Sequence, residues 1–144
     1  MSNYPEWWDT TLTLYNKYTD SKGEIFWYMT VLKDCFWKYT GEEVRVNDSV
    51  LSTKDTICRI PKNSDFLERY EWEQLEDKTS RFTLGRGDIL VRGEVEDTID
   101  EYTRGQRSTD LLDKYREQGC VEITEYRINT GRGRALEHYF VRGV

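Results

Sequence analysis

The residues that could do chemistry in this chain are few and widely separated. His138 is the single histidine, and the three cysteines are Cys35, Cys58 and Cys120. A nucleophilic site needs a serine or cysteine tied to a histidine by spacing, and a zinc site needs cysteines and histidines at short intervals. Neither pattern occurs. We therefore expect no catalytic residue, no metal site and no cofactor, and we interpret His138 as a structural residue.

The cysteines also indicate a cellular compartment. They are odd in number, far apart and embedded in apolar, strand-like runs, which is typical of buried free thiols under reducing conditions and not of a disulfide framework. Residues 1–8 lack the basic region and apolar stretch of a signal peptide, and no run is long enough to span a bilayer. These features predict a protein that is made inside the cell and has no membrane partner.

One basic stretch, Gly131-Arg132-Gly133-Arg134, stands out in an otherwise acidic chain. Arginines on a loop tip can reach phosphates or carboxylates. Because these glycines do not follow a strand and open a helix, neither a P-loop nor a dinucleotide fingerprint applies. Two interpretations remain: a hairpin loop with solvent-facing arginines, or arginines that pair with the acidic face of a neighbouring subunit. Contact with DNA is a weaker third. Arg132 and Arg134 are candidate interface residues.

Charge and aromatic content set broader limits. The net charge of −6 argues against a protein that grips the phosphate backbone, although it suits a wall past which DNA slides. Aromatic residues make up 14% of the chain while apolar residues make up only 37%, and aromatic residues are enriched at the centres of protein interfaces. Adjacent Trp7 and Trp8 point in different directions in an extended chain, so they too are candidate interface residues. The alternative is that all the aromatic rings pack internally.

The elements that would position these residues read mainly as strands. A single domain, residues 1–144, is organised around a buried strand at residues 89–91 between Gly87 and Gly93. We predict a small antiparallel β-barrel or sandwich with one short α-helix, an N-terminal arm at residues 1–9 and a long loop region at residues 62–86. The other expected strands cover residues 11–18, 25–31, 35–39, 56–60, 120–128 and 136–142.

Several local features refine this prediction. Residues 25–39, interrupted by Lys33-Asp34, form two strands or one strand bent at a bulge. The apolar phase shifts within residues 120–128, which indicates either a bulge or a strand whose two faces both meet other groups. A hairpin with Asn47-Asp48 at its tip is expected within residues 41–56, and a helical turn within residues 65–70. The helix should cover residues 109–117, with Ser108 as its N-cap and Gly119 beyond its end. The acidic run at residues 94–101 should be mostly a solvated face.

The order of these segments resembles a known family. Thr11-Leu12-Thr13-Leu14-Tyr15-Asn16 is followed by the turn Asp20–Gly23, the strand with Trp27, Cys35-Phe36-Trp37 and later Gly87-Asp88-Ile89-Leu90-Val91-Arg92-Gly93-Glu94. In this order and character, roughly residues 10 to 95 are similar to phage head-tail joining proteins. The chain looks most similar to the head-closure, or stopper, connectors of Gram-positive phages and prophages. The acidic run, the helix and the last two strands depart from the minimal pattern.

The resemblance implies a role without bond chemistry. Such a protein is a virion structural component, assembled in the host cytoplasm as a homo-oligomeric ring that caps the DNA channel and docks the tail. Its partners would be copies of itself, the portal or adaptor, tail proteins, and DNA that passes without specific binding. By position, residues 41–56 or residues 62–81 would supply the gate. Two alternatives are a tail-completion protein and an acidic phage accessory protein that inhibits a host defence complex.

Overall fold

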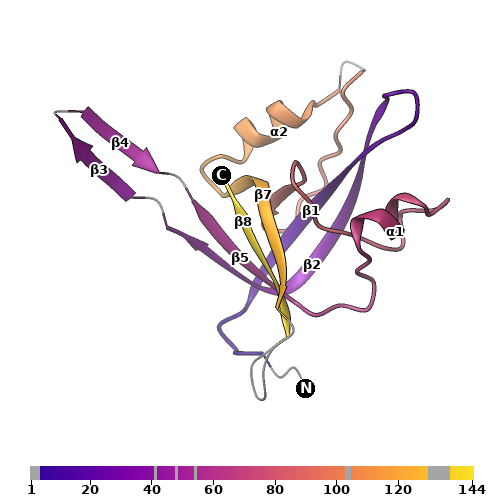
Figure 1. Cartoon of the computed structure of the whole chain (residues 1–144), viewed down its shortest axis with the longest axis horizontal. Helices are drawn as coiled ribbons and strands as arrows, with labels where there is room; N and C mark the ends of the chain where they lie inside the picture. The colour runs from indigo at the N-terminus through magenta and orange to yellow at the C-terminus, as the bar shows by residue number, and fades with distance from the viewer. Residues whose placement is uncertain (1–3, 41, 48, 54, 103–104, 130–136) are drawn as a thin grey trace.

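In the part of the chain that the structure describes, six antiparallel strands close into a barrel. The computed structural model describes residues 4–40, 42–47, 49–53, 55–102, 105–129 and 137–144 (Figure 1). The prediction of a mainly β, antiparallel barrel is confirmed. In order around the barrel, the strands are β1 (Thr10–Thr19), β2 (Ile25–Tyr39), β5 (Thr56–Pro61), β8 (His138–Gly143), β7 (Cys120–Asn129) and β6 (Ile89–Arg92).

Strand β6 lies at the centre of one wall, as its apolar sequence predicts. Leu90 is paired with Leu14 of β1 on one side and with Val121 of β7 on the other. Ile89, Leu90 and Val91 are all buried, because residues on both faces of this strand meet packed side chains. The flanking Gly87 and Gly93 have φ angles of 96° and 107°, which only glycine adopts without strain.

Strand β2 is one bent strand and not two. The pairing of β1 with β2 shifts register between Thr10↔Cys35 and Leu12↔Leu32. Asp34, in the extra stretch on β2, has a φ of 60°, so this is a β-bulge. The bend lets β2 leave β1 and pair with β5 over Phe36–Tyr39. Of the two arrangements that the sequence left open, the structure therefore has the bulge.

The barrel wall carries apolar side chains on both faces. Leu12 and Leu14 point into the main core inside the barrel. Tyr15, which points to the opposite face, packs with Leu111 of α2 (Ser108–Lys114) in a second core cluster. This helix is shorter than predicted, and its N-cap is Arg107, whose N–H donates to the Asp110 carboxylate at 3.0 Å. Among the described residues, no helix has the length and apolar character needed to cross a membrane.

The long loop region packs against the barrel through one short helix, α1 (Arg69–Glu73). The predicted helical turn at residues 65–70 was placed too early. Asn63 accepts the N–H of Asp65 at 2.8 Å and holds that stretch as a tight turn. The helix forms where Trp72, fully buried, reaches the rings of Tyr18 and Tyr28 at centroid distances of 6.1 and 5.7 Å. The position of α1 is thus determined by its contact with β1 and β2, which pair as a two-stranded ribbon.

Two hairpins complete the fold. Strands β3 (Glu42–Val46) and β4 (Ser49–Thr53) pair with each other and extend away from the barrel (Figure 1). Asn47, between them, has a φ of 49° as expected of a hairpin tip, while Asp48 lies outside the described residues. In β7 the register shifts between Ile123 and Glu125, so of the two arrangements expected for this strand the structure has the bulge. The last strand, predicted for residues 136–142, covers His138–Gly143; Glu137 lies outside it, and residue 136 is not among the described residues.

Candidate assembly interface

The adjacent tryptophans lie at one end of the barrel and point in different directions. Trp8 is buried, stacked on Tyr4 at 5.3 Å and edge-on to the His138 ring at 5.6 Å. Trp7 is 64% exposed and touches only the edge of the ring cluster, with Phe36 at 5.4 Å. Trp7 is therefore the ring that remains available to a neighbour, while Trp8 serves the packing of its own chain.

His138 has a structural environment. It is buried, and its Nε2 lies 2.9 Å from Nη1 of Arg59. Because a guanidinium can only donate, this ring nitrogen accepts. His138 also pairs with Asn129 across β7 and β8, so these two described residues flank the predicted arginine loop. Arg132 and Arg134 themselves lie outside the described residues, and their role at an interface stays a prediction.

The three thiols are poorly suited to chemistry. Burial raises the pKa of Cys35 and of Cys120 to about 12, and it raises the pKa of Cys58 as well. Since the thiolate is the reactive form, these cysteines behave as small apolar residues. Across the described ranges, no three His, Cys, Asp or Glu side chains gather closely enough to hold a metal ion.

A buried carboxylate ties the loop region to the barrel. Asp88 is fully buried and accepts hydrogen bonds from Arg69 Nη1 at 2.7 Å, Asn16 Nδ2 at 2.8 Å and the N–H of Lys17 at 2.9 Å. Burial raises the pKa of Asp88, and the Arg69 guanidinium counteracts that rise. Asn16 also donates to the carbonyl of Thr83 at 2.7 Å. The sequence did not predict this network, because Asn16, Arg69 and Asp88 lie far apart along the chain.

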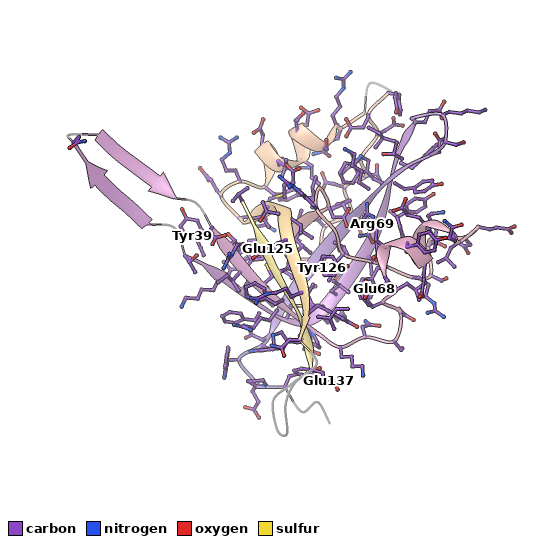
Figure 2. The ribbon with its side chains drawn as sticks, in the orientation of Figure 1. Tyr39, Glu68, Arg69, Glu125, Tyr126 and Glu137 are labelled. Atoms are coloured by element: carbon purple, nitrogen blue, oxygen red, sulfur yellow. The ribbon has the colours of Figure 1, made fainter. Side chains whose placement is uncertain are left out.

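A second link joins the loop region to β7. Tyr126 Oη donates to the carboxylate of Glu68 at 3.1 Å, and Figure 2 shows Glu68 and Arg69 facing this side of the barrel. The Arg69 guanidinium also lies over the Trp72 ring at 5.3 Å. The two polar contacts, made by Glu68 and Arg69, lie at the N-terminal end of α1, and the buried Trp72 side chain fixes the helix against the barrel. This part of the long loop region is a fixed layer on the barrel.

The acidic run is only partly a solvated face. From Glu94 to Glu101 the residues alternate between exposed and half-buried. Asp97 accepts a hydrogen bond from Lys114 Nζ at 2.6 Å, and this bond, with another from a nearby tyrosine, lowers the pKa of Asp97. Glu101 accepts from Trp27 Nε1 at 3.2 Å. The expectation of a mostly solvated face is therefore wrong for the half-buried carboxylates, which bond within the chain.

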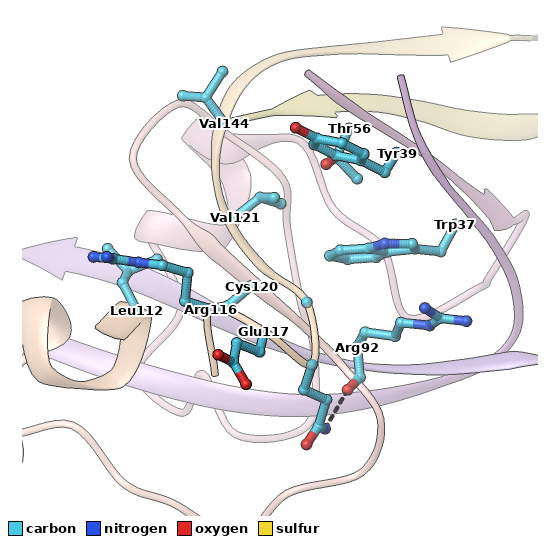
Figure 3. A pocket seen from close by; sticks show the side chains of 12 residues that line it. Trp37, Tyr39, Thr56, Arg92, Leu112, Arg116, Glu117, Cys120, Val121 and Val144 are labelled. Carbon is cyan, nitrogen blue, oxygen red and sulfur yellow. Dashed lines mark hydrogen bonds between the residues drawn. The ribbon is translucent and has the colours of Figure 1, made fainter. Parts of the chain in front are cut away.

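A groove opens at the base of the projecting hairpin. Its volume is about 690 Å³. Trp37 and Tyr39 form one wall, and Arg92, Arg116 and the C-terminal Val144 lie on the others (Figure 3). Aromatic rings beside arginines are typical of protein–protein contact surfaces. Tyr39 is also 60% exposed, so this end of the barrel presents an aromatic surface next to the hairpin.

Apolar side chains are also exposed on both faces of the two-stranded ribbon formed by β1 and β2. Phe26 and Met29 of β2 are each 42% exposed. Neither residue was singled out in the sequence, although the uncharged run from Ile25 to Leu32 is visible there. Together with Trp7 and Tyr39, they place exposed apolar side chains at several separate points around the barrel. A protein that contacts two neighbours in a ring needs at least two such surfaces.

Comparisons with known proteins identify a family but no activity. A family model described as "Family of unknown function (DUF6751)" matches residues 7–144. Neither the curated proteins nor the solved structures contain a match to the chain. The match covers every described strand of the barrel and the projecting hairpin.

Proposed function

We propose that this chain, which belongs to the DUF6751 family, is a phage head-tail connector. In this proposal the protein is a virion structural component of the head-closure type. Copies assemble into a ring that caps the DNA channel and docks the tail. The chain performs no reaction, and its partners are copies of itself, the portal or adaptor, and tail proteins.

The observation that carries this proposal is a closed barrel from which one two-stranded hairpin projects (Figure 1). A closed barrel is a rigid block that can be repeated around an axis. Among the described strands, β3 and β4 pair only with each other, so the hairpin can reach beyond its own subunit. Of the two segments expected to gate the channel, the loop region is anchored by Trp72 and Asp88. The β3–β4 hairpin is therefore the segment that we assign to contacts with a neighbour or the channel.

The separated apolar surfaces support the same proposal. Trp7 lies at one end of the barrel, and Tyr39 lies beside the base of the hairpin. A ring built from head-to-tail contacts buries two different surfaces of each subunit. The acidic net charge of −6 also suits a channel wall, because it denies the DNA backbone a binding site.

The experiment that tests this proposal measures assembly. The full chain is mixed with the purified portal and adaptor of the same phage, and the particle mass is measured by native mass spectrometry and negative-stain imaging. We expect one ring of chains bound to the portal complex. A chain that stays monomeric with both partners present, at concentrations well above their own assembly threshold, would contradict the proposal. Binding to a tail-tube protein instead would indicate a tail-completion role.

A second candidate function rests on the acidic run. Glu94, Glu96 and Asp100 are exposed, as in a protein that imitates nucleic acid and inhibits a host defence complex. However, Asp97 and Glu101 bond to side chains and backbone of their own chain, which reduces the free charge on this face. A pull-down with the chain as bait separates the two functions, because this candidate requires a basic host protein as the partner.

A further inference from the structure

One side of β2 is an open strand edge. β1 pairs with β2 along Ile25–Val31, but β5 pairs with β2 only over Phe36–Tyr39. Within the described residues, no strand pairs with the far side of β2 before the bulge. The N–H of Ile25 donates to Tyr102 Oη at 2.7 Å and thus points away from β1.

The direction of this N–H fixes the direction of the next ones. In an antiparallel pair, successive residues alternate between bonding to the partner strand and pointing away from it. The N–H groups of Trp27, Met29 and Val31 therefore point the same way as that of Ile25, toward the open edge. Other segments pack on both faces of this part of β2, since Tyr28 packs on Trp72 and Trp27 bonds to Glu101, while Phe26 and Met29 remain 42% exposed.

This edge lacks the usual protection. Strand edges in soluble proteins commonly carry charged residues or proline, which prevent another strand from pairing with them. The residues from Ile25 to Leu32 include neither. Met29, in the middle, is 42% exposed. An uncharged run of aromatic and β-branched residues, with the N–H groups of Trp27, Met29 and Val31 pointing away from β1, is suited to accept a further strand.

The projecting hairpin offers a strand of matching character. In the described part of the chain, β3 and β4 pair only with each other, and an isolated two-stranded hairpin is marginally stable in water. The sequence of β3 contains Glu42, Glu43 and Arg45, whereas β4, Ser49–Thr53, has no charged residue. The outer edge of β4 is thus the less protected edge. Its length of roughly 16 Å fits along the open edge of β2.

We propose that β4 of one copy adds as a strand to the Ile25–Val31 edge of β2 in a second copy. The contact is head-to-tail, since donor and acceptor are different surfaces, and such contacts close into rings when the rotation allows. This inference deepens the proposed function by naming the contact through which copies assemble. The closure of these contacts into a ring rests on the proposed connector function, whereas the β4–β2 contact itself does not. Each copy donates one strand and accepts one.

Photo-cross-linking tests this contact directly. A photo-cross-linking amino acid replaces Leu51 of β4 in the full chain, and this chain is mixed with isotope-labelled copies, alone at high concentration and on portal rings. Mass spectrometry of the mixed-isotope products identifies the partner peptide. We expect residues 25–31 of the other copy. Products on residues 49–53 of the other copy, products elsewhere, or no product between copies would each overturn the proposal.

Two variants of Met29 separate the backbone from the side chain. Met29→Pro removes an N–H that points away from β1, so the β1–β2 ladder keeps its bonds, and we expect at least a tenfold loss of the cross-linked product. Met29→Ala, the matched control, keeps the N–H and should retain the product. If Met29→Pro fails to fold, Met29→Lys places a charge on the edge, and its normal product yield would contradict the proposal.

The outcomes for the two proposals are distinguishable. A ring on the portal whose cross-links map elsewhere would refute the β4–β2 contact and leave the connector role standing. Cross-links between β4 and β2 in a chain that never binds portal, adaptor or tail proteins would support the β4–β2 contact and refute the connector role.

Discussion

Removal of the Asp88 carboxylate should detach the loop region from the barrel. Asp88 is fully buried, while the Arg69 side chain is 28% exposed. Asp88→Ala leaves three donors without their acceptor: the Arg69 guanidinium, the Asn16 amide and the N–H of Lys17. Breaking a buried ion pair costs about 3–5 kcal/mol. Because water reaches Arg69, we expect a loss near the lower end, about 3 kcal/mol in the free energy of unfolding.

The assay is urea unfolding followed by tryptophan fluorescence, with Asp88→Asn as the control. Asparagine keeps the volume and one acceptor, so its cost should be smaller, about 1–2 kcal/mol. A double-mutant cycle with Arg69→Ala should give a coupling free energy of at least about 1 kcal/mol. Hydrogen exchange should also rise in residues 62–86 before it rises in β6. A loss below about 1 kcal/mol for Asp88→Ala, with no coupling to Arg69, would refute the anchoring of this region.

Further predictions concern the tryptophans, the acidic run and the thiols. Trp8→Ala should lower the free energy of unfolding by about 3–5 kcal/mol, whereas Trp7→Ala should change it by less than about 0.5 kcal/mol yet weaken assembly; equal losses of stability would contradict this. The lowered pKa of Asp97 adds stability that is complete above about pH 4 and is lost on further acidification. In Asp97→Asn the thermal unfolding temperature should therefore fall less steeply as the pH is lowered below about 4 than it does in the unmodified chain. Cys35 and Cys120, whose pKa values are about 12, should resist thiol reagents at pH 8 until the chain unfolds; a fast-reacting thiol in the folded protein would oppose this.

The sequence predicted the barrel best where local signals and tertiary packing agree. Residues 89–91 are apolar throughout and lie between glycines, and a strand buried on both faces requires that pattern. The two bulges were each one of two alternatives in the sequence, indicated by the interruption Lys33-Asp34 and by the shift of the apolar phase after Ile123. These features depend on a few neighbouring residues, so a reading along the chain can find them.

The sequence could not place elements whose position depends on distant contacts. α1 forms at Trp72 because Tyr18 and Tyr28, far back in the chain, receive its ring. The role of Asp88 depends on Arg69 and Asn16, which are distant in sequence and meet it only in the folded chain. The open edge of β2 was equally hidden, since its composition is visible in sequence while its lack of a second partner strand is not.

The central claim, that this chain is a built-in part of a virion, is tested most directly by measuring it in purified phage particles. Intact virions are banded on a density gradient, and the copies of the chain per particle are quantified against the portal protein by mass spectrometry with labelled standards. The connector role predicts several copies per particle, in a fixed ratio to the portal and retained after a salt wash. A chain that is abundant in the infected-cell lysate but absent from washed particles would contradict the account.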